Sequence, residues 1–278
     1  MRKVVKICSW IIIVIILWGI NMFMWYSAVI VKNIKDTNSY PFYNSDDHLI
    51  AHAGGTIDDN VYTNSLEAIE TSIKEGRKFI EIDMIKTSDD FYIAGHDWEL
   101  VNRMTGREDL QDKPQSLAEY RQAKILEKYS TLDEYQIAEL MKKYPNWIML
   151  IDKARDIKHI VKSFPYPDRV ILQVYGLHGY FKALKQGIKY PVLRLKGGRR
   201  GIKEIYKLAM KMFNIKGVIL GEKSFNKNMD YIKKLHDNGV AVILYGNPSF
   251  KIVESHEQIN KYAKEYIDLV DTDTVKSL

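Results

Sequence analysis

The sequence predicts an α/β protein whose main part is a (β/α)8 TIM barrel, preceded by a single N-terminal transmembrane helix. The barrel is predicted because strand-like and helix-like segments alternate from residue 48 onward, and because several strand-like segments are apolar throughout. Helical crossovers imply a parallel sheet, and strands without a polar face are typical of a sheet covered on both sides. About eight such units in roughly 230 residues fit a closed barrel better than an open doubly wound sheet.

Short segments rich in β-branched and other apolar residues mark the expected strands. They are Leu49–Ala53, Phe79–Ile85, Phe91–Ala94, Trp147–Asp152, Val170–Val174, Pro191–Leu195, Gly217–Leu220, Val240–Leu244 and Leu269–Val270. Segments with helical periodicity are expected between most of them, at Ser65–Glu75, Leu132–Lys143, Ile202–Phe213, Asn228–Asn238 and Glu254–Glu265. In the first of these, Leu66, Ile69 and Ile73 share one side, as an amphipathic helix requires.

An apolar run near the N-terminus, residues 7–31, contains twenty-five residues and no charge. At about 1.5 Å per residue, a helix of this length exceeds the roughly 30 Å hydrocarbon core of a bilayer. Trp10, Trp25 and Tyr26 lie near its ends, where aromatic rings favour the membrane interface. A cleaved signal peptide is the alternative, but its apolar region is usually about 7–15 residues long, and residues 27–29 are a poor cleavage site.

Four segments divide the chain: a short basic N-terminus (1–6), the transmembrane helix (7–31), a polar and turn-rich linker (32–47) and the barrel (48–278). The basic residues on the two sides of the helix differ little in number, and a long downstream domain translocates largely regardless of its charge. We therefore expect a single-pass protein of the cell membrane with an extracytoplasmic barrel.

The charge pattern gives no reason to expect a nucleic-acid partner. The net charge is only +6, and the basic residues are scattered among acids without dense basic blocks. Cys8 is the single cysteine, so an intramolecular disulfide is impossible. The chain also lacks a glycine-rich phosphate loop of dinucleotide or P-loop spacing.

Glu81 and Asp83 are separated by one residue in the expected strand Phe79–Ile85. Side chains two positions apart in a strand point to the same face, so both acids project together while Ile80 and Ile82 pack on the other face. Two ionised carboxylates at this distance repel each other, and the cost grows with burial. A solvated strand end would explain them without a function. The alternative is a hard divalent cation, Ca²⁺ or Mg²⁺, which takes oxygen ligands of this kind.

Imidazoles and further acids stand at the ends of other expected strands. The carboxyl ends of barrel strands gather around one mouth, so these side chains are expected close together. The positions concerned are His52, Glu81, Asp83, His96 and Asp152. One acid at a strand end is common, whereas five such positions at successive ends indicate a functional site.

These residues resemble the motifs of the glycerophosphodiester phosphodiesterases, within the superfamily that includes phosphatidylinositol-specific phospholipases C. The family pattern runs His-Arg-Gly, Glu-Asn-Thr, Glu-x-Asp, His-Asp and Arg-x-Thr-Gly, and later includes an acid and a lysine on one strand. The matching segments are His52-Ala53-Gly54, Thr63-Asn64-Ser65, Glu81-Ile82-Asp83, His96-Asp97, Arg103-Met104-Thr105-Gly106 and Asp152-Lys153. The resemblance covers nearly all of the chain from His48 onward.

The resemblance implies a metal-dependent barrel that cleaves phosphodiesters. Three carboxylates would hold the divalent cation, Ca²⁺ or Mg²⁺: Glu81, Asp83 and Asp152. His52 and His96 would share general acid and base catalysis, which suits imidazole because its unperturbed pKa of about 6.5 lies near working pH. Lys153 would add positive charge beside the phosphate.

Three departures from the family pattern bear on this assignment. Ala53 stands where the family has arginine, so a bidentate phosphate contact is missing, and Thr63 stands where it has glutamate. Asp152 and Lys153 are adjacent rather than two apart, so both reach the site only if a bulge or the strand end turns the chain.

A basic loop after the expected strand Pro191–Leu195 offers a replacement for the missing arginine. Lys196, Arg199 or Arg200 is expected to supply a cationic phosphate contact, with an ordinary solvated loop as the alternative. Trp98 and Tyr175 are expected as packing residues, because large aromatics near strand ends more often pack than bind. His159, His178, His236 and His256 fall on expected helices or their ends and are expected at the surface.

The predicted function is a membrane-anchored, metal-dependent hydrolysis of glycerophosphodiesters, in lipid head groups or in envelope polymers that contain glycerol phosphate. Two alternatives stay open: a phospholipase of the C or D type on the same barrel, and a non-catalytic descendant that binds phosphorylated ligands. Ala53 and Thr63 favour the last of these. The intact histidines and the Glu-x-Asp pair favour an enzyme, because a binding barrel has little need for all four.

Overall fold

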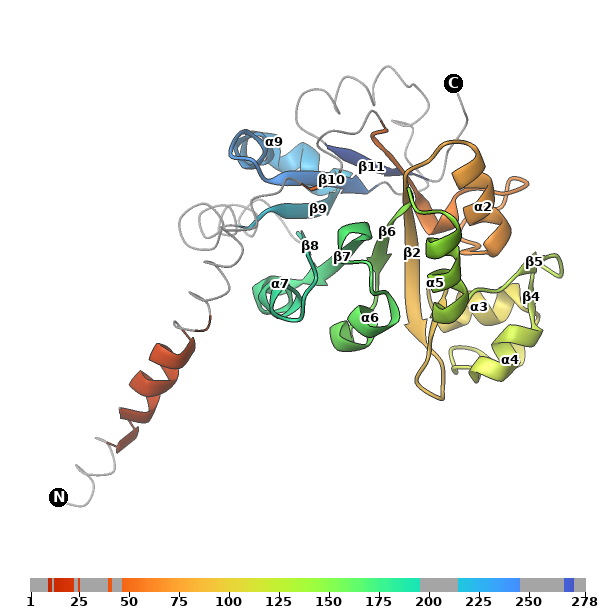
Figure 1. Cartoon of the computed structure of the whole chain (residues 1–278), viewed down its shortest axis with the longest axis horizontal. Helices are drawn as coiled ribbons and strands as arrows, with labels where there is room; N and C mark the ends of the chain where they lie inside the picture. Colours follow the sequence, from red (N-terminus) through yellow and green to blue (C-terminus); the bar gives the residue numbers. More distant parts are fainter. Residues whose placement is uncertain are drawn as a thin grey trace.

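The computed structural model of the chain describes residues 10–11, 13–22, 25, 40–41, 47–195, 215–245 and 268–272. A sheet of parallel strands forms the centre of the described part (Figure 1). These strands are β1 (Leu49–Ala51), β2 (Phe79–Lys86), β6 (Ile148–Asp152), β7 (Val170–Tyr175), β8 (Tyr190–Arg194), β9 (Gly217–Gly221), β10 (Ala241–Tyr245) and β11 (Leu269–Thr272). The expected strands are therefore confirmed at each place, with ends that differ by one or two residues.

The parallel strands pair in a closed ring. The sheet order is β1-β11-β10-β9-β8-β7-β6-β2, and β1 pairs with β2 as well as with β11. Each of these pairings is parallel. A parallel sheet whose last strand returns to its first is the barrel that the alternation of strands and helices predicts.

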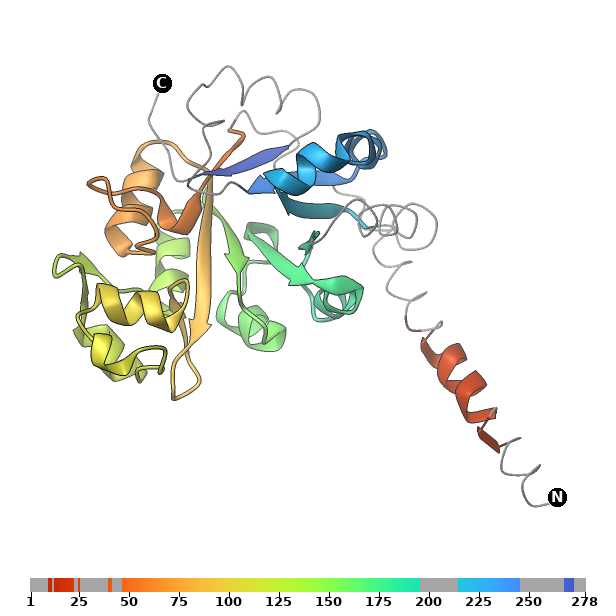
Figure 2. The same ribbon diagram turned by 180° about the vertical axis from the view of Figure 1, so that it is seen from behind.

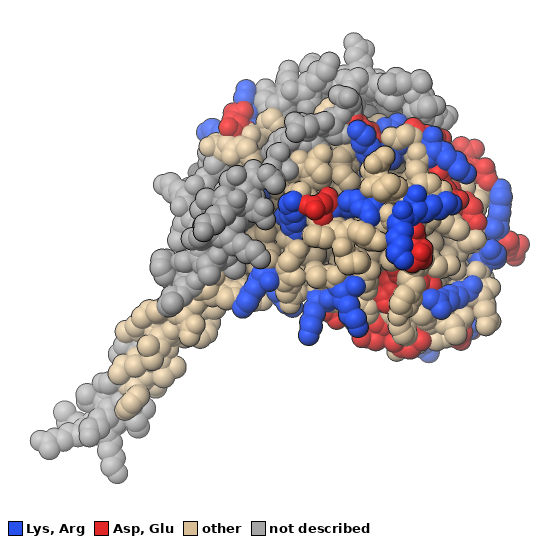
Figure 3. Space-filling model, viewed as in Figure 1, with Lys and Arg blue, Asp and Glu red and all other residues tan. Residues whose placement is uncertain are grey.

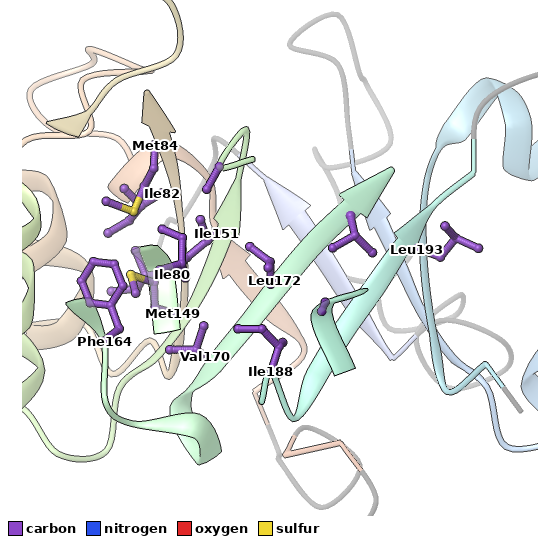
Figure 4. Packing of buried hydrophobic residues seen from close by; sticks show 14 of the residues in the cluster. Ile80, Ile82, Met84, Met149, Ile151, Phe164, Val170, Leu172, Ile188 and Leu193 are labelled. Atoms are coloured by element: carbon purple, nitrogen blue, oxygen red, sulfur yellow. The ribbon is translucent and has the colours of Figure 1, made fainter. Parts of the chain in front are cut away.

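Two apolar layers follow from the alternation of side chains along the strands. One layer fills the ring and takes residues from every strand of it, among them Ile50, Phe79, Leu150, Ile171, Val192, Ile219, Ile243 and Leu269. The other layer faces the helices and contains the intervening residues, such as Ile80, Ile82 and Met149 (Figure 4). Residues two positions beyond the first layer therefore point into the same ring, at its carboxyl end.

Helices cover the outer face of the ring, as Figure 2 shows from behind. They are α2 (Leu66–Lys74), α5 (Glu134–Lys143), α6 (Ile157–Ser163), α7 (Gly176–Lys185) and α9 (Glu222–Asp237), whereas α3 (Trp98–Met104) and α4 (Leu117–Gln122) pack in a separate apolar cluster with Ile93. The N-termini of α2 and α5 are capped by the side chains of Ser65 and Asp133, which accept bonds from backbone N–H groups. The expected helices 202–213 and 254–265 lie outside the described residues.

One expected strand does not belong to the barrel. Phe91–Ala94 corresponds to β3 (Tyr92–Ala94), which pairs antiparallel with β2, with Met84 opposite Ala94. The connection from Lys86 to Tyr92 is too short for the crossover of a dozen or more residues that parallel neighbours need. The chain after β3 therefore reaches the mouth from a hairpin. A further small hairpin, β4 (Lys124–Ile125) and β5 (Tyr129–Ser130), follows α4.

The predicted transmembrane segment is only partly described. Its described residues 10–11, 13–22 and 25 are helical, and most of their large apolar side chains are exposed, for example Trp10 at 68% and Ile15 at 61%. Figure 3 shows no charged side chain along this stretch. Among the residues that the structure describes, none of the helices has both the length and the apolar character that crossing a membrane requires. The remainder of the predicted span lies outside the described residues.

Two of the histidines expected at the surface have carboxylate partners. His178 is exposed, as expected, but His159 Nε2 lies 2.7 Å from the buried Glu134 Oε2. His236 Nε2 on α9 lies 3.6 Å from Asp268 Oδ1. Helical periodicity alone cannot reveal such partners, because they come from other elements. His256 lies outside the described residues.

Asp268 links three parts of the fold. Its Oδ2 accepts a hydrogen bond of 2.7 Å from the backbone N–H of Val242, and its carbonyl oxygen lies 3.1 Å from His48 Nδ1. The hydrogen bond to Asp268 raises the pKa of His236 against the opposing effect of burial. The folded protein therefore favours the protonated imidazole.

We predict that His236→Gln lowers the melting temperature more at pH 5.5 than at pH 9. A raised folded-state pKa gives stability that is complete below the unfolded value of about 6.5 and is lost as the pH rises through the folded value. Thermal denaturation of both proteins at the two pH values measures the difference. His178→Gln is the matched control and should show no such pH dependence. Equal losses for His236→Gln at both pH values would contradict the prediction.

Candidate active site

A cavity of about 380 Å³ opens at the carboxyl ends of the parallel strands. Its lining is mostly polar and brings together residues from most parts of the ring and from two loops. The lining residues are His52, Tyr62, Glu81, Asp83, His96, Leu150, Asp152, Lys153, Gln173, Tyr175, Arg194, Tyr245 and Asp271. In a barrel of this kind, the carboxyl-terminal mouth is where catalytic residues are found.

Glu81 and Asp83 on β2 are the buried acids of this cavity, each with only 2% of its surface exposed. They follow Phe79 into the ring at two-residue intervals, which confirms that both project from one face. Asn64 supports the second acid: its Oδ1 accepts a 3.1 Å bond from the Asp83 N–H. The backbone N–H of Ala53 donates a 2.8 Å bond to Glu81 Oε2.

Burial and mutual repulsion act on both acids. Burial, followed by the charge of Asp83, raises the pKa of Glu81 well above its usual range. Burial also raises the pKa of Asp83, against the opposing charges of His96 and Lys153. Each acid thus resists ionisation unless positive charge is brought close to it.

His52 lies in a tight turn directly after β1. The turn His52–Gly54 places Ala53 in the left-handed region, at φ 48°. Gly55 follows at φ 99°, and a Cβ there would lie 2.2 Å from Ser72 Oγ, so the turn requires glycine at this position. The turn brings His52 Nε2 to 4.0 Å from Glu81 Oε2.

His96 follows β3 and faces the same cavity from the hairpin. Its Nδ1 lies 2.5 Å from Asp97 Oδ2, while Asp97 Oδ1 accepts a 2.8 Å bond from the N–H of Leu100 at the start of α3. Although burial opposes the shift, these two bonds lower the pKa of Asp97. Asp97 is therefore both the cap of α3 and the partner that orients the imidazole.

Tyr62 lies between the two imidazoles. Its ring meets the ring of His52 edge-on, with centroids 4.6 Å apart, and that of His96 edge-on at 5.5 Å. The residue has φ 61°, an uncommon conformation for a bulky side chain. The loop backbone thus holds an aromatic ring against both histidines.

Asp152 ends β6 opposite Asp83, its register partner on β2. Its Oδ1 accepts a 2.7 Å bond from Tyr175 Oη and a further bond from Gln173 Nε2. Lys153 follows at φ 62°, and this left-handed turn at the strand end lets both neighbours line the cavity. The turn of the chain at the strand end, which the sequence requires if both residues are to reach the site, is therefore present.

The cavity is also lined by residues that the sequence did not predict. Arg194, Tyr245 and Asp271 each stand two positions after a residue of the inner apolar layer, at the end of β8, β10 and β11. The alternation of side chains along those strands could have predicted these residues, because each shares a strand face with an apolar residue of the inner layer. Tyr175 lines the cavity as well, whereas the sequence predicts a packing residue, and Trp98 does pack in a buried cluster.

The structure brings together most of the residues that the sequence proposed for the site. The proposed residues that line the cavity are His52, Glu81, Asp83, His96, Asp152 and Lys153. Lys196, Arg199 and Arg200 lie outside the described residues. Thr63 is buried and its Oγ1 lies 3.1 Å from Ser65 Oγ, away from the cavity lining.

Among the residues that the structure describes, two groups of side chains could hold a metal ion. Glu81, Asp83 and Asp152 each offer one carboxylate oxygen, and these oxygens lie within 4.8 Å of one another. His52, Glu81 and Asp271 form a second, overlapping group by the same measure. Hard divalent cations such as Mg²⁺ and Ca²⁺ prefer the all-oxygen set. The residues present therefore fit such an ion.

Residues 52–145 match the glycerophosphoryl diester phosphodiesterase family. The matched segment contains both cavity histidines and the acids of β2, and it ends before Asp152. A search of curated proteins found no match.

Solved structures extend the likeness beyond that segment. A glycerophosphoryl diester phosphodiesterase from Parabacteroides distasonis has a TM-score of 0.62 and 16% identity, and covers 84% of this chain and 86% of its own. A glycerophosphodiester phosphodiesterase from Thermotoga maritima has a TM-score of 0.58 and 17% identity, and covers 83% and 96%. A phosphodiesterase from Oleispira antarctica, in complex with its product sn-glycerol-3-phosphate, has a TM-score of 0.60 and 17% identity, and covers 82% and 93%.

At these identities the structures establish a shared fold, and the family match covers the segment that carries both histidines and the paired acids. Residues 52–145 are therefore similar to the glycerophosphoryl diester phosphodiesterases, which are phosphoric diester hydrolases, and the fold of the chain is the one that these solved structures share.

Proposed function

We propose that this chain hydrolyses glycerophosphodiesters in a reaction that needs a divalent cation, at a site held close to a membrane by the N-terminal apolar run. One observation carries the proposal: two imidazoles from loops and four carboxylates from three strands converge on one cavity. The similarity of residues 52–145 to the glycerophosphoryl diester phosphodiesterase family supports hydrolysis of a phosphodiester.

Glu81, Asp83 and Asp152 are the proposed ligands of the cation, Ca²⁺ or Mg²⁺. Their oxygens are close enough to share one ion, and the raised pKa values of Glu81 and Asp83 indicate that the pair lacks compensating charge. When bound, such a cation neutralises negative charge on the phosphate oxygens as the transition state forms.

His52 and His96 are the proposed acid and base. One imidazole removes a proton from the attacking water as its oxygen bonds to phosphorus, and the other donates a proton to the departing ester oxygen as its bond to phosphorus breaks. The products are a phosphomonoester and an alcohol, so protons and charge balance across the step. Of the two imidazoles, His96 has the more fixed orientation, because the carboxylate of Asp97 holds one of its ring nitrogens.

Lys153 is the proposed phosphate contact from β6, since it lines the cavity beside Asp152. Lys196 and Arg199 remain proposed contacts from the basic loop after β8, on the strength of their position in the sequence. Ammonium and guanidinium groups both bind phosphate oxygens, the latter in a bidentate manner.

A glycerol phosphate ester is the proposed substrate group. The Oleispira antarctica phosphodiesterase of the same fold holds sn-glycerol-3-phosphate as its product. The uncharged N-terminal run supports a location near a membrane, where lipid head groups and envelope polymers of this chemistry occur. Product analysis on a panel of glycerophosphodiesters, phospholipids and polymers distinguishes these substrates.

A second candidate function is ligand binding without turnover. Ala53 favours this function, because it stands where the family has arginine and an alanine side chain cannot bind phosphate. The one described hydrogen bond from this residue to Glu81 comes from its backbone N–H. Tight binding of glycerol phosphate without turnover, in the presence of either cation, would support this function.

We predict that His52→Ala and His96→Ala each lower kcat on a chromogenic phosphodiester by about 100-fold or more, the usual contribution of a positioned acid or base. The melting temperature should change little, because both rings are partly exposed at the mouth. The exposed His178→Ala serves as control and should keep full activity. Retained activity in both site variants would refute the assigned roles.

We predict that EDTA abolishes turnover and that Ca²⁺ or Mg²⁺ restores it. Addition of the effective cation should also raise the melting temperature of the chelated protein, because a ligand that binds only the folded state stabilises it. Asp83→Asn should lose both effects, whereas Asp230→Asn, at an exposed position of α9, should keep them. Full turnover in EDTA would exclude the proposed role of the cation.

We predict that the full chain is recovered with the membrane fraction and needs detergent for release. A chain that begins at residue 37 should be soluble and keep its activity, because the uncharged run lies entirely before that residue. Fractionation followed by activity assays measures both. A full chain that stays soluble without detergent would contradict the anchor.

A further inference from the structure

Arg194 is a cation of the cavity for which the sequence predicted no role. It stands at the end of β8, two residues after Val192 of the inner apolar layer, and its side chain is 19% exposed. In the order of the ring, β8 lies opposite β1, which carries His52 at its end. The sequence from Arg169 to Lys203 contains no aspartate or glutamate, so this wall is poor in acids.

The guanidinium group is held by a carboxylate and two aromatic rings. Nη1 lies 3.2 Å from Asp152 Oδ2. The guanidinium carbon lies 4.4 Å from the ring centre of Tyr245 and 5.8 Å from that of Tyr175. Stacking and an ion pair together restrict the plane of the group, which reduces the entropy lost when a ligand binds.

The hydrogen-bonding capacity of Arg194 is incompletely used. An arginine side chain carries five N–H donors, and Nε is buried without a hydrogen-bond partner. A buried donor without a partner is costly, and water, an ion or a ligand often completes such a group. Because the side chain lines the cavity, a bound anion can accept from the remaining donors.

The lining of the cavity carries more acidic than basic side chains. Its described lining contains four carboxylates, Glu81, Asp83, Asp152 and Asp271, against Lys153 and Arg194. A phosphodiester is itself an anion, and the family arginine beside His52 is replaced by Ala53. Even with a cation between the acids, the substrate requires a contact that offsets its own charge.

We propose that Arg194 binds a non-bridging oxygen of the substrate phosphate, from the wall opposite the position at which the family carries its arginine. The inference rests on the proposed function for the identity of the substrate. Asp152 then has two roles. Its Oδ2 orients the guanidinium group of Arg194, and the residue stays close enough to Glu81 and Asp83 to share a cation with them. The alternative is that Arg194 only balances the charge of Asp152.

The test measures binding and turnover separately in the full chain with its cation. Arg194→Gln keeps an amide donor for Asp152 but removes the charge, and Arg194→Lys keeps the charge but removes the planar fork. Arg155→Gln is the matched control, because Arg155 is exposed and stacks on Tyr175 at 4.8 Å without lining the cavity. Calorimetry gives Kd for sn-glycerol 3-phosphate, and a chromogenic phosphodiester gives KM and kcat.

Arg194→Gln should weaken glycerol 3-phosphate binding and raise KM by about 10-fold or more, as expected for loss of a charged hydrogen bond of about 1.5 kcal/mol. Arg194→Lys should recover part of the loss, and Arg155→Gln should change neither constant by more than about twofold. A lower melting temperature with unchanged Kd and KM in both Arg194 variants would overturn the inference and leave charge balance as the role.

The outcomes separate this inference from the proposed function. If the wild type turns over substrate and neither Arg194 variant changes Kd or KM, the inference alone is overturned. Wild-type binding that depends on Arg194, without any turnover, supports the inference and refutes hydrolysis. A wild-type chain that neither binds glycerol 3-phosphate nor hydrolyses a phosphodiester overturns both.

Discussion

The repulsion between Glu81 and Asp83 is the interaction on which the rest of the site depends. Strand geometry forces both side chains to the same face of β2, and the ring of the barrel buries both almost completely. Two carboxylates cannot both ionise cheaply in such a place. The surroundings reflect that constraint: an N–H of Ala53, the amide of Asn64, two imidazoles and the charge of Lys153 act on the pair.

The barrel turns this local constraint into a site. Each strand contributes an apolar residue to the inner layer, and the residue two positions later points into the same ring at its open end. On β6, β8, β10 and β11 these later residues are Asp152, Arg194, Tyr245 and Asp271. A ring of polar side chains therefore follows from the same alternation that fills the centre with apolar ones. The loops then add His52, His96 and Tyr62 from the side of β1 and β2.

The barrel and the acidic side of the cavity could be predicted from the sequence, because both depend on the spacing of residues that are close together in the chain. Apolar strands at regular spacing predict the parallel ring, and the spacing of Glu81 and Asp83 predicts their shared face. The hairpin of β3 was not predicted, since a short apolar segment does not reveal whether its partner is parallel. Arg194 was not predicted, because a single charged residue at the end of an apolar strand does not show which face of that strand points into the ring. Tyr62 could not be predicted, because a left-handed loop residue carries no periodic signal.

The most direct measurement of the central claim is the anomalous scattering of crystals soaked with Mn²⁺, a divalent ion that also favours oxygen ligands. The account predicts one strong peak within bonding distance of the carboxylate oxygens of Glu81, Asp83 and Asp152, with both imidazoles facing the same side of it. A peak bound elsewhere, or no peak in crystals of a protein that is active with Mn²⁺, would contradict the account.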